Sequence, residues 1–372
     1  MNKPSIVLAA LAALVSTSLG GEVRLWFGTY TSATNGSKGI YTSTLDTDTG
    51  KLAAPVVAGD AKSPSFLALS PNGKNLYAAL EDGGGSVGAF SVAANGTLTA
   101  QGTESAGGGG TCHVWVDATG RSVLAANYGG GSVASFLTKA DGSFEKRASF
   151  IQHTGSGPDK GRQEKPHAHS IYTNAANTLA YACDLGTDDV FIYKLDAATA
   201  TLKPNTPASG RAPAGSGPRH FALHPGGKFA YTNNEMGLSV TAFSVNADDG
   251  GLKEMQTIPT LPEGTNPKGV STAEMFCRPD GKFLYVSNRT HDSITAYAIG
   301  SDGKLTFVQN ETTRPALVPR GFGISPDGRW LVAAGQQSGK VVVFKIDAAT
   351  GKLSPTGQTV DVPAAVCVVF GK

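Results

Sequence analysis

Two histidines, His167 and His169, lie two positions apart in the segment Pro166–Ser170 (PHAHS). Side chains at positions i and i+2 of an extended segment point to the same face. An imidazole pair of this kind could bind a metal ion or supply a general base near neutral pH. The deeper of the two could instead be a structural histidine. We take His169 as the candidate base and His167 as its alternative.

Two arginines and one glutamate are further candidates for chemistry. Arg219 follows a proline that fixes the backbone as an apolar run begins, and its guanidinium offers a fork of donors to a carboxylate, a phosphate or a carbonyl oxygen. Glu235 and Arg289 occupy equivalent positions in neighbouring sequence repeats, so we expect them to be close in space. A purely structural pairing of Arg219 with Glu235 is the alternative.

An internal repeat of about fifty residues positions these side chains. The segment Ser70–Lys74 (SPNGK) is followed by an apolar run, a glycine-rich loop, a second apolar run and Gly-Thr-Leu. Equivalent segments begin at positions 117, 174, 224, 278 and 325, and the intervals between the positions equivalent to Pro71 are 47, 57, 50, 54 and 47 residues. A shorter seventh copy covers 25–52.

The repeats predict an all-β fold, a seven-bladed β-propeller. Each unit has four short β-like runs separated by turns, which in the second unit cover 66–69, 75–80, 86–92 and 97–102. The first copy lacks the opening run, and 363–370 matches that run at the other end of the chain. We therefore expect the last strand to join the first blade and close the ring. A solenoid is improbable because no segment has a 3.6-residue period.

The repeat also predicts which side chains gather at one end of the innermost strands. The first two strands of a blade form a hairpin, so the start of the first strand and the end of the second strand meet. These positions concentrate His, Arg, Glu, Asn and Tyr, a composition typical of a site for an anionic or oxygen-rich small molecule. The predicted substrate-binding residues are His220, Asn127, Tyr128, Asn234, Glu274 and Arg320.

The N-terminus predicts export. Lys3 precedes the uncharged run Ile6–Val15, and small residues follow near Gly20, as in a cleavable signal peptide. We expect residues 1–20 to be removed and 21–372 to form the propeller domain, in the periplasm or outside the cell. An uncleaved leader or a buried first strand is the alternative. No later run approaches the 18 apolar residues of a membrane-spanning helix.

Composition narrows the classes of partner. The chain has 372 residues with 31 Lys and Arg against 29 Asp and Glu, a formal net charge of +2, which argues against a nucleic-acid binder. We expect a monomer without cofactor, metal, nucleic-acid or membrane partners. The cysteines show no framework or zinc spacing, and we expect small buried apolar residues rather than one long-range disulfide. They are Cys112, Cys183, Cys277 and Cys367.

Several familiar chemistries lack their motif. The chain has no G-x-S-x-G elbow, no H-E-x-x-H and no G-x-x-x-x-G-K-[ST], and its glycine runs 107–110 and 129–131 lie in turn contexts that indicate blade connections. The polar segment His153–Asp159 lengthens one repeat interval to 57 residues. A loop of this kind is expected to overhang the site.

The sequence resembles the propeller-type 6-phosphogluconolactonases, a family that also contains fungal carboxymuconate cyclases. In the cyclase branch a histidine, two arginines and a glutamate are thought to form the active site. By this resemblance they correspond to His169 or His167, Arg219, Arg289 and Glu235. The matching segments are FGTYTS (27–32), ANYGGGSV (126–133), HTGSGPD (153–159), PHAHS (166–170), GSGPRH (215–220), STAEM (271–275) and SNRTHDSI (287–294).

The resemblance implies hydrolysis of a sugar lactone, with His169 activating water. We expect Arg219 to hold the reacting carbonyl, Arg289 the anionic tail of the substrate, and Glu235 to orient the histidine or an arginine. Three alternatives remain: a cycloisomerase of muconate-type diacids, a non-catalytic extracellular binding propeller, and a calcium-dependent lactonase. The last would draw oxygen ligands from Glu235, Asn127, Asp184 and Asn234.

Overall fold

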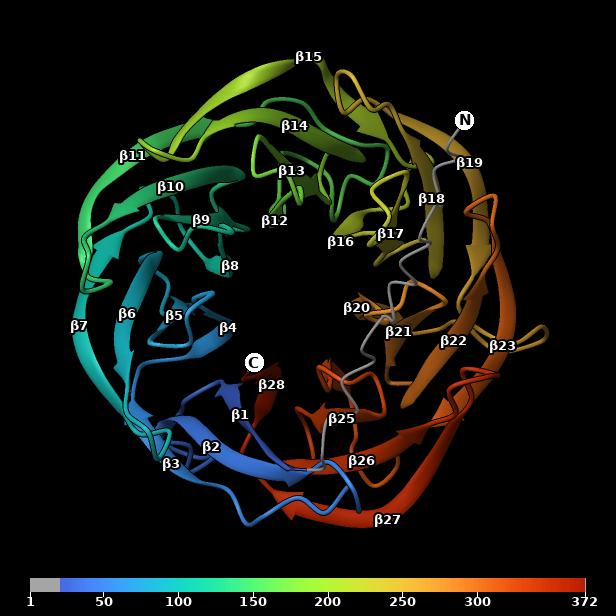
Figure 1. Cartoon of the computed structure of the whole chain (residues 1–372). Helices are drawn as coiled ribbons and strands as arrows, with labels where there is room; N and C mark the ends of the chain where they lie inside the picture. The colour runs from blue at the N-terminus through green and yellow to red at the C-terminus, as the bar shows by residue number, and fades with distance from the viewer. Residues whose placement is uncertain (1–20, 372) are drawn as a thin grey trace, which may run out of the picture.

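A computed structural model describes residues 21–371. In this range 28 strands form seven four-stranded antiparallel sheets, and the sheets stand around a central channel (Figure 1). The fold is therefore the predicted all-β, seven-bladed propeller. Between residues 21 and 371 the structure contains no helix with the length and hydropathy needed to cross a membrane. The expected signal peptide, residues 1–20, lies outside the described residues.

Each blade runs from an inner strand beside the channel to an outer strand at the rim. The bounds of the first three blades are β28 (Ala365–Phe370), β1 (Glu22–Thr29), β2 (Gly39–Asp46) and β3 (Val56–Asp60); β4 (Pro64–Leu69), β5 (Asn75–Leu80), β6 (Ser86–Val92) and β7 (Leu98–Ser105); and β8 (Thr111–Val116), β9 (Ser122–Asn127), β10 (Ser132–Thr138) and β11 (Phe144–Gln152).

The other four blades repeat this order. Their bounds are β12 (Ala168–Thr173), β13 (Leu179–Asp184), β14 (Asp189–Asp196) and β15 (Thr201–Arg211); β16 (Pro218–Leu223), β17 (Phe229–Asn234), β18 (Ser239–Val245) and β19 (Leu252–Pro259); β20 (Ser271–Cys277), β21 (Phe283–Arg289), β22 (Ser293–Ile299) and β23 (Leu305–Thr312); and β24 (Pro319–Ile324), β25 (Trp330–Gly335), β26 (Lys340–Ile346) and β27 (Leu353–Asp361).

The ring closes as the repeat pattern predicted. Strand β28 pairs antiparallel with β1, with Phe370 opposite Leu25 and Val368 opposite Phe27. The C-terminal strand therefore supplies the inner strand of the first blade, and Figure 1 shows it facing the channel beside β1. This pairing removes the open edge that an unclosed array of blades would expose.

Packing between blades supplies the core. Each of the core clusters in the described chain joins two adjacent blades, as where Leu25 and Phe27 pack with Val332 and Val341. Side chains of the second strand also bind the next blade: the hydroxyl of Tyr77 donates to the carbonyl of Gly142 at 2.8 Å. Equivalent bonds join Tyr181 to Gly250, Tyr231 to Gly303 and Tyr285 to Gly351.

All four cysteines are free thiols, as expected. Cys112, Cys183 and Cys367 are buried and Cys277 is half-buried.

A β-bulge near the start of each inner strand re-aims one side chain. In β12, for example, the register with β13 shifts between Ala168 and Ser170, which leaves His169 unpaired. A bulge places two residues opposite one and turns the extra side chain out of the regular alternation. The bulged positions are Ser65, Cys112, His169, Arg219, Ala273 with Glu274, Arg320 and Val366.

Candidate active site

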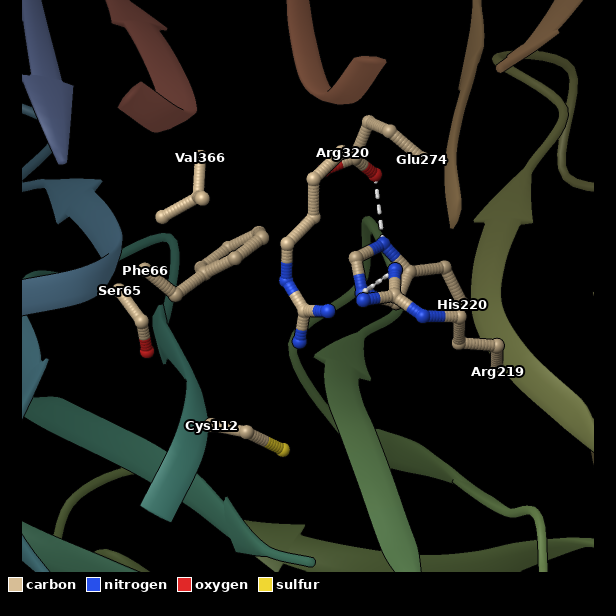
Figure 2. Close-up of a pocket in the computed structure, with 8 residues that line it drawn as sticks. All are labelled: Ser65, Phe66, Cys112, Arg219, His220, Glu274, Arg320 and Val366. Carbon is tan, nitrogen blue, oxygen red and sulfur yellow. Dashed lines mark hydrogen bonds and ion pairs between the residues drawn. The ribbon is translucent and has the colours of Figure 1, made fainter. Parts of the chain in front are cut away.

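Six of the bulged side chains line one small cavity in the channel, here called the upper cavity. Together with Phe66 and His220 they form its wall (Figure 2). Adjacent blades thus deliver polar groups to one place because the bulge recurs at the same point of the repeat. The six are Ser65, Cys112, Arg219, Glu274, Arg320 and Val366.

Arg320 projects into the upper cavity toward His220 and Arg219 (Figure 2). Its guanidinium lies over the ring of Tyr30, 5.5 Å from the ring centroid, and the Tyr30 hydroxyl donates to Glu81 at 2.7 Å. Arg320 itself makes no hydrogen bond or ion pair with any residue from 21 to 371. A guanidinium in this state can receive an oxygen anion without first losing a protein partner.

Glu235 is held by three guanidinium groups. Its Oε2 accepts from Arg219 Nε at 3.0 Å and Arg289 Nη2 at 2.9 Å, and its Oε1 accepts from Arg162 Nη2 at 2.6 Å. Burial raises the pKa of a carboxyl group, but Arg289, Arg219 and Arg162 together hold the pKa of Glu235 at about 2. The predicted proximity of Glu235 and Arg289 is confirmed, and Glu235 orients arginines rather than a histidine.

Arg219 connects this cluster to the upper cavity. Besides Glu235 it contacts the carbonyl of Ala273, and its Nη1 lies 3.1 Å from His220 Nε2. Burial, followed by the nearby charge of Arg320, lowers the pKa of Arg219. Two guanidinium groups therefore face the same small space, which favours an anion between them.

His220 and Glu274 form a buried pair between adjacent blades. His220 Nδ1 lies 2.5 Å from Glu274 Oε1, which also accepts from the backbone N–H of Met275. Because Arg219 donates to Nε2 of His220, Nδ1 must carry the imidazole proton and donate it to Glu274. Burial lowers the pKa of His220 well below 6.5 and raises the pKa of Glu274 to about 8.

His169 lies beside the upper cavity, in contact with Cys112, which lines it. Its Nδ1 is 3.8 Å from the Cys112 sulfur, and its ring centroid is 5.4 Å from that of His220. Nε2 makes no hydrogen bond within the described part of the chain. Burial, followed by the charge of Arg219, lowers the pKa of His169 well below 6.5, so its imidazole is neutral near pH 7 and can accept a proton.

His167 lies farther out, stacked on the ring of Tyr128. The two ring centroids are 4.6 Å apart, whereas His169 meets the same tyrosine ring edge-on at 5.4 Å. Both ring nitrogens of His167 have partners, the Tyr128 carbonyl at 3.0 Å and Glu164 at 3.3 Å. Of the two histidines, His169 is thus the one that keeps a nitrogen available.

The family model for "Lactonase, 7-bladed beta-propeller" matches residues 24–370. The chain belongs to this family. It is 37% identical to the 6-phosphogluconolactonase of Bacillus subtilis over 348 residues, which cover 93% of this chain and 97% of that one.

Two solved structures of this family have nearly the same fold. The periplasmic gluconolactonase of Pseudomonas aeruginosa superposes with a TM-score of 0.87 at 29% identity, over 95% of this chain and 99% of that one. A protein from Lactobacillus plantarum gives 0.88 at 30% identity, over 95% and 100%.

In this lactonase-family chain, three of the six predicted substrate-binding residues do not line the upper cavity: Tyr128, Asn127 and Asn234. Asn127 and Asn234 are fully buried, and their amide nitrogens donate to Ser132 at 3.0 Å and Ser239 at 2.9 Å. Asn288 makes the equivalent bond to Ser293, 3.2 Å long. The asparagine recurs because it ties the second strand of a blade to the third.

Asp184, a possible calcium ligand, is likewise engaged with protein groups. Its Oδ2 lies 2.6 Å from His153 Nδ1, and the other nitrogen of that ring is 2.7 Å from the Tyr193 hydroxyl. Its Oδ1 accepts from the backbone N–H of His167 at 2.7 Å. Within residues 21–371 no group of three or more His, Cys, Asp or Glu side chains is arranged to hold a metal ion.

Sequence reasoning missed Arg162. It lies in the segment between β11 and β12, the one whose extra length predicted an overhanging loop, and its contact with Glu235 shows that the loop reaches the site. Arg162 also donates to the Tyr128 hydroxyl at 3.2 Å. Its loop is the longest connection between an outer strand and the next inner strand in the described chain, so the other repeats offer no equivalent position that could have identified Arg162. The sole signal was a basic residue within a long polar interval.

Proposed function

We propose that this protein is a hydrolase that opens a sugar lactone, 6-phosphogluconolactone or a related aldonolactone. The observation that carries the proposal is the unpartnered Arg320 guanidinium, directed into the upper cavity toward Arg219. Two adjacent cations suit the oxyanion that forms when a lactone carbonyl is attacked. The relatives named 6-phosphogluconolactonase and gluconolactonase support this reaction class.

In the first step, His169 acts as general base. Its neutral imidazole takes a proton from water while the water oxygen attacks the lactone carbonyl carbon. The carbonyl π electrons move to oxygen, and Arg320 and Arg219 donate hydrogen bonds to the resulting oxyanion. Arg219 is held for this role by Glu235 and by the Ala273 carbonyl.

In the second step the ring opens. The oxyanion re-forms the carbonyl, the bond between the acyl carbon and the ring oxygen breaks, and protonated His169 returns its proton to that oxygen. The product is the open-chain hydroxy acid, and the base is regenerated neutral. One water molecule is added to the lactone, and every residue that takes part returns to its starting protonation state.

We further propose that the protein works outside the cytoplasm. The N-terminal run Ile6–Val15 with its small-residue cleavage site supports export. So does the relative from Pseudomonas aeruginosa, a gluconolactonase described as periplasmic. Fractionation of cells that express the full chain, with N-terminal sequencing of the purified product, tests this point. A cytoplasmic product that retains residues 1–20 would contradict it.

The function is tested by measuring proton release from gluconolactone and 6-phosphogluconolactone with the purified protein, with and without EDTA. We expect hydrolysis well above the spontaneous rate and no effect of EDTA. Because burial and Arg219 hold the pKa of His169 well below 6.5, kcat/KM should stay constant as the pH falls through 6.5. Turnover of a muconate-type diacid but of neither lactone would overturn the proposal.

A further inference from the structure

The loop between β11 and β12 brings one side chain to the polar site from outside the propeller core. Arg162 reaches Glu235 at 2.6 Å and also contacts Tyr128. Glu235 directly follows β17, the second strand of the blade after the one that begins with β12. The remainder of the polar cluster comes from the inner two strands of the blades or from the residues that directly follow them. Among the three arginines that contact Glu235 in the described chain, Arg162 is therefore the one that comes from a loop rather than from a blade strand.

The three arginines on Glu235 differ sharply in exposure. The side chain of Arg162 is 44% exposed, that of Arg289 is 13% and that of Arg219 is 3%. Because nearly half of the Arg162 side chain lies in water, its guanidinium can exchange Glu235 for another anion at a lower cost than either of the two buried arginines can. Glu235 would keep two buried guanidinium partners if Arg162 turned away, and its charge would stay compensated.

The backbone that carries Arg162 is firmly anchored. The next residue, Gln163, is fully buried, and its amide nitrogen donates to the Leu185 carbonyl at 2.8 Å and to Asp188 at 2.7 Å. Its backbone N–H donates to the carbonyl of Asp159 at 2.7 Å. Movement can therefore be confined to the Arg162 side chain, which keeps the guanidinium at the rim of the site.

The charges around the site are not balanced. Four guanidinium groups, those of Arg162, Arg219, Arg289 and Arg320, meet the carboxylates of Glu235 and Glu81. The third nearby acid, Glu274, keeps its proton near pH 7 because burial raises its pKa to about 8. Glu164, bound to His167 at 3.3 Å, adds a third carboxylate near the rim, so guanidinium groups still outnumber carboxylates there. A net positive charge favours an anionic substituent such as a phosphate monoester, which carries close to two negative charges at this pH.

We propose that Arg162 is a specificity determinant that leaves Glu235 to bind an anionic substituent, a phosphate, at the end of the substrate remote from the lactone carbonyl. The inference rests on the proposed function, because it assumes that the carbonyl lies inside, at Arg320 and His169. The remote end then points outward to Arg162 and the Tyr128 hydroxyl. This assigns to Arg162 the role that the sequence suggested for Arg289, whose side chain is bound to Glu235 and to the Thr272 carbonyl.

The experiment compares 6-phosphogluconolactone with gluconolactone for the wild type, Arg162→Ala and Arg162→Lys. For Arg162→Ala we expect the ratio of the two kcat/KM values to fall about tenfold to a hundredfold, the effect of losing a charge-assisted bidentate contact. The loss should appear in KM for the phosphorylated lactone, because a remote contact is equal in ground and transition states. Arg162→Lys keeps the positive charge but cannot form the bidentate hydrogen bonds of a guanidinium, so its ratio of kcat/KM values should lie between those of the wild type and Arg162→Ala.

Lys160→Ala is the matched control. Lys160 is an exposed cation on the same loop, and its ammonium group contacts the Gly157 carbonyl at 3.2 Å. This variant should leave the ratio unchanged. Equal losses on both lactones in Arg162→Ala would overturn the inference, since they would mean that Arg162 merely holds Glu235 in place.

A second measurement separates this inference from the proposed function. If the wild type hydrolyses neither lactone, the proposed function fails, and calorimetric titration with gluconate 6-phosphate and gluconate then tests Arg162 alone. We expect the wild type to bind the phosphorylated acid more tightly and Arg162→Ala to lose tenfold or more of that difference in Kd. Equal Kd values for the two acids in the wild type would overturn the inference.

Discussion

The two halves of the central channel are built by the same inner strands but have opposite character. At one end, near the bulges, lie the polar groups of the upper cavity. At the other end the same strands and the turns that follow them line a cavity of about 810 Å³, here called the lower cavity, whose wall is largely aromatic and aliphatic. It includes Trp115, Tyr172, Phe221, Phe276 and Phe370. Phe66 and Glu274 line both cavities and stand between them.

The difference in polarity between the two halves indicates which half is arranged for function at a cost in folding stability. The lower half is lined mainly by apolar side chains, of which Trp115, Phe276 and Phe370 are half-buried. The upper half concentrates guanidinium groups, and that of Arg320 has no hydrogen-bond or ion-pair partner within residues 21–371. Like charges held close together destabilise a fold, so their concentration in one half indicates a functional requirement there. The comparison predicts that changes in the upper half affect turnover, whereas those in the lower half affect stability.

The largest effect is expected for His169→Ala. Loss of a general base should lower kcat by about a hundredfold to ten-thousandfold, while KM changes little because the anion contacts belong to arginines. Steady-state kinetics on either lactone measures this, with His167→Ala in parallel. A turnover defect in His167→Ala alone would show that the other histidine is the base.

In the lower half, Phe221→Ala should reduce stability and spare the chemistry. Phe221 is 2% exposed and its ring stacks on Tyr181 with centroids 4.9 Å apart. Removing a buried phenyl ring costs about 3 kcal/mol of unfolding free energy or more, which urea unfolding would measure. We expect kcat to stay near the wild-type value below the melting transition. A large fall in kcat without a change in stability would break the comparison.

Arg320→Met should separate turnover from stability within the upper half. We expect kcat to fall about a hundredfold because an oxyanion donor is lost, whereas Tm should change little because the half-buried guanidinium of Arg320 makes no hydrogen bond or ion pair within residues 21–371. Arg219→Met is the contrast: it takes a buried partner from Glu235, so Tm should fall as well. If Arg320→Met lowers Tm as much as Arg219→Met does, Arg320 is a structural residue.

A pH dependence of stability is expected at the boundary between the cavities. Burial raises the pKa of Glu274 from 4.5 to about 8 in the folded protein, which therefore holds a proton that the unfolded chain releases. The contribution of Glu274 to stability should decrease as the pH rises from about 4.5 to about 8. The buried histidines His113, His169 and His220, whose pKa values burial lowers well below 6.5, act in the opposite direction, so the contribution of Glu274 is read from the difference between the wild type and a variant without this carboxyl group. Glu274→Gln, which is neutral at every pH, should remove this contribution. Urea unfolding near both ends of the range compares the two proteins, and parallel slopes would refute the assignment.

The fold was predictable because the copies of the repeat can be compared with one another within this one sequence. The recurring turns, the missing first strand in the opening copy and its match at 363–370 required seven blades and closure by the last strand. The same periodicity predicted that Arg219, Glu274 and Arg320 lie at one end of the channel, since equivalent residues of adjacent blades must surround one channel. It also placed Glu235 near Arg289.

The repeat does not predict the role of every residue at equivalent positions of the blades. It assigned Asn127 and Asn234 to substrate binding, although both side chains tie neighbouring strands of their own blade. An equivalent position in the repeat shows which end of a strand a residue occupies. It does not show on which side of that strand the side chain lies.

Sequence by itself therefore determined the all-β ring, its closure and the set of polar positions at one end of the channel, because these depend on order and spacing along the chain. Tertiary structure alone decided which of those positions act together. It joined His220 to Glu274 across two blades, brought Arg162 from an unusually long loop onto Glu235, and left the Arg320 guanidinium without a hydrogen bond or ion pair among residues 21–371. Such pairings depend on side-chain direction and on distances of a few ångströms, which a repeat of about fifty residues does not encode.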